Sequence, residues 1–167
     1  MNDTPVQTTN YVADPGRIAD LARHIREGEL SPADLVRGCL DRIKVTEPAI
    51  KAWREVCVDT VVTEAEQRAK EVESGIVCGP LHGIPVGIKD IIDVAGVPTR
   101  CNSLSRAGAA PATADAEIVS ALRVAGALIL GKTETTEFAY FNPSPARNPH
   151  NIEHTPGGSS SGSAAAG

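Results

Sequence analysis

Gly83-Ile-Pro-Val-Gly-Ile-Lys-Asp90 places one lysine, Lys89, at the end of an apolar and β-branched run. The residues from Ile84 to Ile92 have the length and composition of a buried β-strand. Burial disfavours the charged form of a lysine and lowers its pKa, so a lysine in such a strand can act as a base near neutral pH. An ion pair of Lys89 with Asp90 or Asp93 at the end of the strand is the alternative interpretation.

The residues before this stretch are rich in charge and have helical periodicity. Apolar residues at helical spacing predict a helix over 15–27. Ser31 as an N-cap, Pro32 in the first turn and Asp34 at the capping-box position predict the start of a second helix. A third helix is predicted over 59–73, where alanine, glutamate, lysine and arginine are common. These segments indicate a helical region from residue 15 to residue 78.

The composition changes after Gly79-Pro80, where charge falls while glycine, proline and β-branched residues increase. A sheet is therefore expected to begin here, with the strand at 84–92 as its first member. The pattern also predicts a helix over 115–125, a short buried strand over 127–130 and an extended loop over 142–156, which contains four prolines. Helices followed by mixed strands and helices indicate an α/β protein.

The overall composition indicates an ordinary globular protein. The chain has 167 residues, a formal net charge of −5 and 41% hydrophobic residues, which fit one folded domain and argue against a basic nucleic-acid binder. No apolar run approaches the roughly 18 residues of a membrane span, and the polar N-terminus lacks the plan of a signal peptide. We therefore expect a cytoplasmic protein that binds neither nucleic acid nor a membrane, with residues 1–14 as a flexible N-terminus.

The cysteines and histidines do not form a metal-binding or disulfide pattern. The four cysteines lie far apart without a Cys-x-x-Cys pair, so we expect free thiols. His150 and His154 lie between prolines that disfavour a helix, and they have no partner at zinc-site spacing. His24 and His82 are expected at the surface or in hydrogen-bonded core positions. We therefore expect no metal and no cofactor.

Two short motifs match other enzyme classes but lack their structural context. Gly126-Ala-Leu-Ile-Leu-Gly-Lys-Thr133 fits a phosphate-binding loop, yet its middle residues form an apolar run typical of a core strand. Gly158-Ser-Ser-Ser-Gly162 fits the nucleophile elbow of serine hydrolases, yet a proline-rich loop stands where a strand is required. The small residues over 157–167 fit either a flexible linker or tight turns followed by a helix.

Taken together and in order, several segments resemble the amidase signature family. They are G-I-P-V-G-I-K-D at 83–90, A-L-I-L-G-K-T-E-T-T-E-F-A at 127–139, R-N-P-H-N at 147–151 and T-P-G-G-S-S-S-G-S-A-A-A at 155–166. The resemblance extends over nearly the whole chain. It implies an α/β fold, the amidase signature fold, in which N-terminal helices over 15–78 precede a mixed twisted β-sheet covered by helices. Residues 79–167 would form the first part of that α/β domain.

Members of this family hydrolyse amides, and some act on carbamates or esters, with a Ser-cis-Ser-Lys triad. The resemblance makes Lys89 the triad lysine and Ser159 the cis-serine, with Ser160 supporting the network by a hydrogen bond. Neutral Lys89 would take a proton from Ser159, which relays it from the nucleophile. The resemblance also places Tyr140 and Phe141 near the substrate, in an apolar acyl or aryl pocket. Closure of the core is the alternative role of this aromatic cluster.

The third triad member is not found in these residues. In the family, the nucleophilic serine follows the cis-serine in a D-x-G-G-S type segment that also offers oxyanion-hole N–H groups, and no serine here has that context. We therefore expect the domain to continue beyond Gly167, and these 167 residues to be inactive without the remaining C-terminal part. An inactive remnant or one half of a split protein is the second interpretation. The amidase subunit of a tRNA-dependent amidotransferase is the third, and a nucleotide-binding protein is the last.

The expected function is therefore the hydrolysis of C–N bonds in a small-molecule amide, without a cofactor. Side activity on carbamates, as a urethanase, or on esters fits the same chemistry. The sequence does not encode which amide is cleaved. It also leaves the oligomeric state open, a homodimer included.

Overall fold

The computed structural model describes residues 17–140 and 142–166, so the N-terminal segment 1–14 lies outside the described residues. Its helices are α2 (Ile18–Arg26), α3 (Pro32–Ile50), α4 (Val58–Glu73), α5 (Glu117–Val124) and α6 (Ser161–Ala166). Its strands are β1 (Trp53–Val56), β2 (Pro85–Lys89) and β3 (Leu128–Thr133). The strands form one sheet of order β1-β3-β2, in which β3 pairs antiparallel with β1 and parallel with β2.

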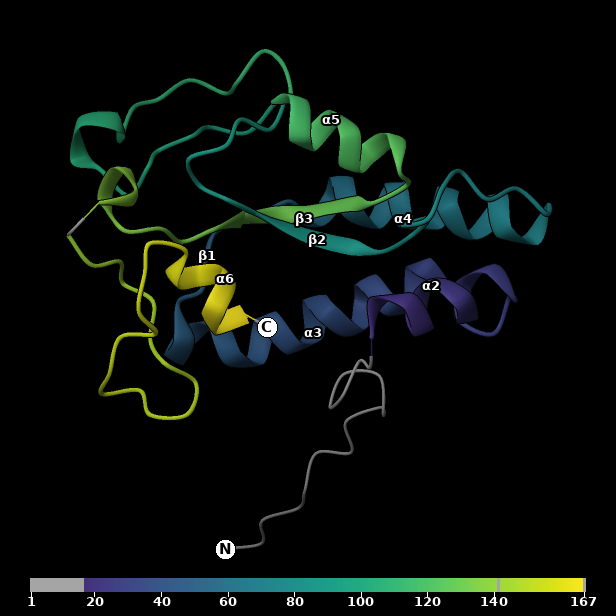
Figure 1. Ribbon diagram of the computed structural model, residues 1–167, viewed down its shortest axis with the longest axis horizontal. Coiled ribbons are helices and arrows are strands. Elements are labelled where there is room, and N and C mark those ends of the chain that lie inside the picture. The colour runs from purple at the N-terminus through teal and green to yellow at the C-terminus, as the bar shows by residue number, and fades with distance from the viewer. Residues whose placement is uncertain (1–16, 141, 167) are drawn as a thin grey trace, which may run out of the picture.

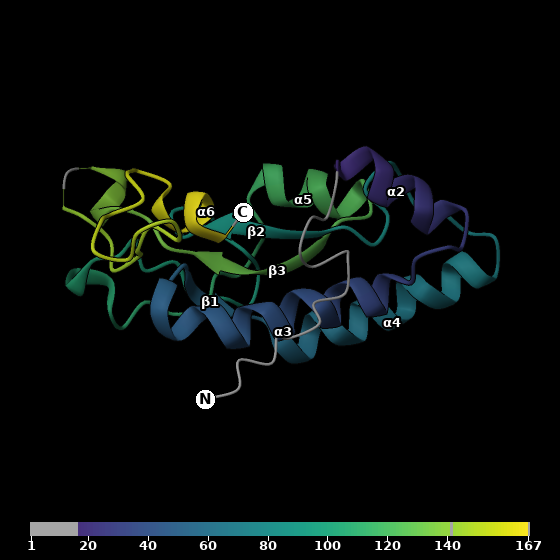
Figure 2. The same ribbon diagram turned by 90° about the horizontal axis from the view of Figure 1, so that it is seen from below.

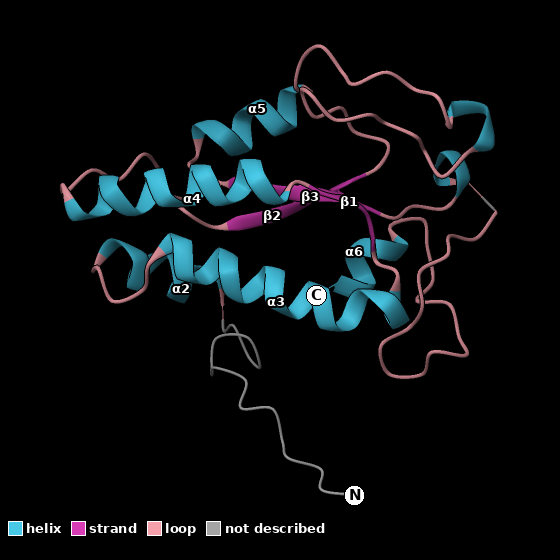
Figure 3. Ribbon diagram, turned by 180° about the vertical axis from the view of Figure 1, so that it is seen from behind, coloured by secondary structure: helices cyan, strands magenta, loops and turns pink. Residues whose placement is uncertain are grey.

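The sheet lies between layers of helices. Figures 1 and 3 show α5 on one side of the sheet and α2, α3 and α6 on the other. Figure 2, turned by 90°, shows α3 and α4 running side by side, and these two helices contact each other while α4 also contacts β3. The C-terminal helix α6 contacts both β2 and β3. The expected α/β architecture is confirmed, with a small mixed sheet.

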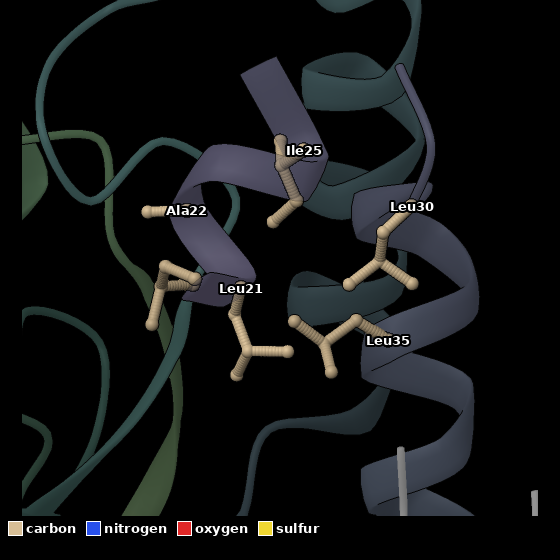
Figure 4. Close-up of a cluster of buried hydrophobic side chains, with 6 residues drawn as sticks. Leu21, Ala22, Ile25, Leu30 and Leu35 are labelled. Atoms are coloured by element: carbon tan, nitrogen blue, oxygen red, sulfur yellow. The ribbon is translucent and has the colours of Figure 1, made fainter. Parts of the chain in front are cut away.

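A cluster of apolar side chains joins the first two helices to the sheet. Its members are Leu21, Ala22, Ile25, Leu30, Leu35 and Ile84. Figure 4 shows the Leu21 side chain of α2 turned toward Leu35, with Ala22 on the other side of the helix. Burying aliphatic side chains contributes roughly 1.5–3 kcal/mol each, so this contact fixes the helical region against the start of β2.

The N-terminus of α3 differs from the sequence expectation in one detail. The helix begins at Pro32 after Ser31 in the N-cap position, as predicted, but the Ser31 side chain makes no capping hydrogen bond. Asp34 instead accepts a hydrogen bond from Arg37 Nη1 at 3.0 Å. The fixed backbone of the proline is therefore what begins this helix, and the predicted capping box is wrong.

The strands differ more from the prediction than the helices do. Strand β2 covers Pro85–Lys89, shorter than the expected 84–92, because the chain turns at Asp90. Strand β3 extends past the expected 127–130 to Thr133 and is buried along its whole length. Strand β1 was not predicted. The helix expected over 115–125 is also shorter, at Glu117–Val124.

Gly131 allows β1 to approach β3 closely. A Cβ at this position would run into the carbonyl oxygen of Glu55 and lie 2.9 Å from the Cα of Val56. The glycine that fits the phosphate-loop pattern is therefore a packing residue inside a strand. Residues 128–133 form an extended strand, which excludes a phosphate cradle there.

Over the described ranges, no helix is long and apolar enough to cross a membrane.

Candidate active site

The centre of the candidate site is a contact between Lys89, the last residue of β2, and Ser159, which lies just before α6. The Lys89 Nζ donates a hydrogen bond to the Ser159 Oγ at 2.7 Å, although the two residues are 70 positions apart in the sequence. The fold thus brings together the two residues that the sequence singled out as triad members.

The Ser159 backbone is held by the residues that follow β3. Its carbonyl oxygen accepts the N–H of Thr136 at 3.0 Å and the hydroxyl of Thr135 at 3.1 Å. The Gly158–Ser159 peptide bond is cis, and Gly157 before it has a φ of 86°, which glycine adopts readily. Thr135 and Thr136 therefore orient the segment that presents the Ser159 hydroxyl to Lys89.

Helix α6 is anchored beside this segment through small residues. The N–H of Gly162 donates to the carbonyl of Glu134 at 2.8 Å, and a Cβ at Gly162 would run into the backbone of Ala52 and Glu134. The hydroxyls of Thr133 and Ser163 lie 2.9 Å apart and share a hydrogen bond. These contacts fix α6 on the same side of the sheet as Lys89.

The electrostatic surroundings favour a neutral Lys89. Burial lowers the pKa of its amine below the ordinary lysine value. Among the described residues, no carboxylate forms an ion pair with it, and Asp90 pairs with Lys132 at 2.9 Å instead. The alternative interpretation of Lys89, an ion pair with Asp90 or Asp93, is therefore wrong.

The neighbouring serines occupy different environments. Ser160 is exposed, and its carbonyl accepts the N–H of Ala164 at 3.1 Å. Over the described residues, its hydroxyl has no hydrogen bond. Ser161 is buried, and its Oγ also lacks a partner within that part of the chain. Of the three consecutive serines, Ser159 is thus the one that contacts Lys89.

Two aromatic residues of the segment that follows β3 lie at the surface. Tyr140 is 71% exposed and Phe138 is 53% exposed, so neither closes the core. Both line an open surface pocket together with Glu137 and Asn142. Phe141, the second residue expected near the substrate, lies outside the described residues.

One group of metal-ligating side chains lies away from this site. Ligand atoms of Glu71, Cys78 and His82 lie within 4.8 Å of one another. His82 is buried, and its Nδ1 accepts the N–H of Cys78 at 3.0 Å while its Nε2 lies 3.1 Å from the carbonyl oxygen of Arg68. The Arg68 guanidinium donates to both Glu71 and Cys78. Because both ring nitrogens have protein partners, we interpret the group as an internal hydrogen-bond network, as expected for a core histidine.

The nucleophile-elbow pattern lacks its strand. Residues 154–160 contain neither strand nor helix, and α6 begins at Ser161. His150 and His154 do not lie on one helix. They belong to a loop in which Asn148 and Asn151 form an isolated β-bridge. The geometry therefore leaves the Lys89–Ser159 contact as the centre of this candidate site.

The contacts of Thr133, Thr135, Thr136 and Ser163 were not anticipated from the sequence. One signal was present: the polar run T-E-T-T directly follows an apolar strand. In the structure Thr133, Glu134, Thr135 and Thr136 are all buried. Buried polar groups need hydrogen-bond partners, so such a run indicates a network.

Comparison with known proteins identifies the family of this chain. The chain matches the family model for Amidase over residues 34–166 and belongs to the amidase signature family. A protein of Mycobacterium tuberculosis (strain H37Rv) named as amidase AmiA2 is 41% identical over 155 residues, which cover 89% of this chain and 31% of that protein. A glutamyl-tRNA(Gln) amidotransferase subunit of Acidothermus cellulolyticus is 39% identical over 153 residues, covering 88% of this chain and 30% of that protein.

Solved structures show the same relationship. The peptide amidase of Stenotrophomonas maltophilia superposes with a TM-score of 0.84 at 38% identity, covering 94% of this chain and 34% of that structure. The chain spans about a third of the length of these relatives.

Proposed function

We propose that the complete protein hydrolyses the C–N bond of amides with a Ser-cis-Ser-Lys triad, in which Lys89 is the base and Ser159 the relay. The observation that carries this proposal is the 2.7 Å hydrogen bond between Lys89 Nζ and Ser159 Oγ. The direction of the Lys89 pKa shift supports it, because a lowered pKa increases the fraction of the amine that is neutral and can accept a proton. We also place this activity in the cytoplasm.

The proposed reaction begins with a nucleophilic serine supplied by a part of the family fold that this chain does not span. Its hydroxyl proton passes to Ser159 Oγ while the Ser159 proton passes to the neutral Lys89 amine. The serine oxygen bonds to the amide carbon, and the C–N bond breaks as the proton returns through Ser159 to the leaving nitrogen. Water then takes the place of the amine and releases the acid by the same relay.

The paired serines provide a test. In protein purified from its native reading frame, Ser159→Ala should lower kcat for amide hydrolysis by about 10²- to 10⁴-fold, the usual contribution of a positioned acid–base group. Ser160→Ala removes an exposed hydroxyl that makes no hydrogen bond to the described residues, so kcat of this variant should stay within about tenfold of the native value. Ammonia or amine release from a panel of amides measures both.

The control for these variants is Ser120→Ala, on the exposed side of α5. This variant should match the unmodified protein. Ser159→Ala with undiminished turnover would rule out the relay role. If Ser160→Ala caused the larger loss, the two roles would have to be exchanged.

We further propose that Tyr140 and Phe141 contact the acyl or aryl part of the substrate. Tyr140 is 71% exposed and lines a surface pocket together with Phe138, Glu137 and Asn142, where an acyl or aryl group would meet an aromatic surface. Tyr140→Ala should change the ratio of kcat/KM between an aryl amide and acetamide by about tenfold, since a lost apolar contact is worth about 1–3 kcal/mol. The ratio is measured by competition between the two substrates, and an unchanged ratio would contradict the pocket role.

A second candidate function is that of an amidotransferase component, favoured by the 39% identity to the amidotransferase protein of A. cellulolyticus. A free-standing amidase releases ammonia from amides when purified alone, whereas an amidotransferase component would depend on partner proteins. The intact mass of the native protein separates both functions from an inactive or split chain. A mass well above 17.4 kDa supports a longer enzyme, and a mass near it supports a chain that needs a complement.

A further inference from the structure

Lys132 and Asp90 form a fully buried ion pair that the proposed reaction does not use. The exposed fraction of the side chain is 0% for Lys132 and 1% for Asp90, and Lys132 Nζ lies 2.9 Å from Asp90 Oδ1. Lys132 is the lysine of the phosphate-loop pattern, which the strand geometry leaves without a phosphate to bind. A charged pair at this depth therefore has another role.

Each partner is tied to further groups. Lys132 Nζ donates a second hydrogen bond to the Thr99 hydroxyl at 2.9 Å. The Asp90 carboxylate accepts the backbone N–H of Arg100 at 3.2 and 3.3 Å. The Asp90 N–H donates to the Thr133 carbonyl and the Asp90 carbonyl accepts the Cys101 N–H, both at 3.0 Å. Asp90 is thus held through its backbone and its side chain together.

The pair adjoins the catalytic lysine. Asp90 follows Lys89 in the chain, and in the sheet Ile88 pairs with Lys132 while Lys89 pairs with Thr133. Successive residues of a strand point to opposite faces. Lys89 therefore reaches Ser159 on one face, and the pair fixes the end of β2 from the other face.

Stability alone does not explain a buried ion pair. Removing two charges from water is costly, and apolar side chains of similar volume often serve a fold equally well or better. A charged pair does specify one alignment, because its atoms must meet in a defined geometry. Here the pair fixes the register of β2 and β3 next to Lys89, where Ile88 pairs with Lys132 and Lys89 pairs with Thr133.

We propose that Lys132 and Asp90 are positioning residues that hold Lys89 within reach of Ser159. This inference rests on the proposed amide hydrolysis. The pair has no net charge. In the intact protein, therefore, neither an unpaired positive charge nor an unpaired negative charge acts on the Lys89 amine.

Other titratable groups surround the pair, and none of them is substituted in the test. Glu55 on β1 is paired with Arg100 at 2.8 Å. Among the described residues, the pKa values of Cys57, Cys101 and Glu134 respond to the charge of Lys132 or Asp90, while Asp93 and Arg106 act on Cys101.

The test uses the variants Lys132→Met and Asp90→Asn and their combination in the native protein. All three should lower kcat by about ten- to a hundredfold with little change in KM, because a base misplaced by 1 Å can cost about a hundredfold. Lys132→Met leaves an anion near Lys89, which favours its protonated form, so the acid limb of the kcat profile moves to higher pH. Asp90→Asn leaves the Lys132 cation near Lys89, which favours the neutral form of Lys89, so the acid limb of the kcat profile moves to lower pH. The double variant, with neither charge, should lie between them.

A second measurement does not depend on turnover. The reactivity of Lys89 toward acetic anhydride, followed by mass spectrometry across pH, reports the neutral fraction of its amine. Lys132→Met should move this labelling profile to higher pH, and Asp90→Asn should move it to lower pH. If the native protein hydrolyses no amide, the proposed function fails while this profile still tests the positioning.

The inference is overturned if the variants fold and keep the kcat and the Lys89 labelling profile of the native protein. It is also overturned if both single variants shift the profile in the same direction. A double variant that fails to fold contradicts it as well, because the pair would then serve stability and not alignment.

Discussion

Lys89→Met should abolish amide hydrolysis, lowering kcat by about 10²- to 10⁴-fold while the fold persists. Methionine has a similar length and suits a partly buried position, so the variant removes the amine that contacts Ser159 and little else. Steady-state kcat measures the loss, and thermal unfolding measures the fold. In the native protein, activity should rise with pH through the lowered pKa of Lys89, because only the neutral amine accepts a proton.

The matched control is Lys70→Met, on the exposed side of α4. Loss of a solvated lysine there should leave kcat and the pH profile unchanged. Lys89→Met with more than about a tenth of the native kcat would be inconsistent with a general base.

Gly162→Ala should have the second large effect, because the added methyl would run into the carbonyl of Ala52 and the N–H of Glu134. Backbone atoms cannot move aside as a flexible side chain can, so α6 must shift. We expect a loss of about 1–3 kcal/mol or more in the free energy of unfolding. Activity should fall further than stability explains, because Ser159 lies two residues before the start of the displaced helix.

Gly108→Ala is the control for this change, since a Cβ at Gly108 meets no atom within 4 Å. Urea unfolding and kcat measured on both variants separate the two sites. If Gly162→Ala and Gly108→Ala had the same free energy of unfolding and the same kcat, α6 would not be held by close packing.

The helices were the most predictable part of the fold. Helix α4 begins one residue from its predicted start and ends at Glu73 as expected, because its apolar residues follow one helical face. Helix α3 begins at Pro32 for a local reason, the preset backbone of proline. Such features depend on neighbours within a few positions, so the sequence displays them directly.

The strands depend on distant partners and were harder to predict. Strand β1 has only four residues, W-R-E-V, whose place in the sheet comes from pairing with β3 far along the chain. Strand β3 continues through Gly131 and Lys132, two residues that suggest a loop. It does so because β1 and β2 pair on both sides, and tertiary pairing overrides local preference.

The candidate site was predictable only in part. The resemblance to a family named Lys89 and Ser159, and the structure places them in contact. Their supports, Thr135 and Thr136, have no local signature beyond a polar run after a strand. The partner of Lys132 was likewise hidden, because the contact with Asp90 forms only when two strands align.

The distance in sequence between Lys89 and Ser159 also sets when the site can assemble in a cell. The 70 residues added after Lys89, up to and including Ser159, take about 4 to 14 seconds to synthesise at typical rates of translation. Strands β2 and β3 can pair during that interval, but the amine has no serine to contact until the segment before α6 has left the ribosome. Assembly of the reactive pair is therefore one of the last events in the folding of this region, and a ribosome stalled before Ser159 would carry a chain without it.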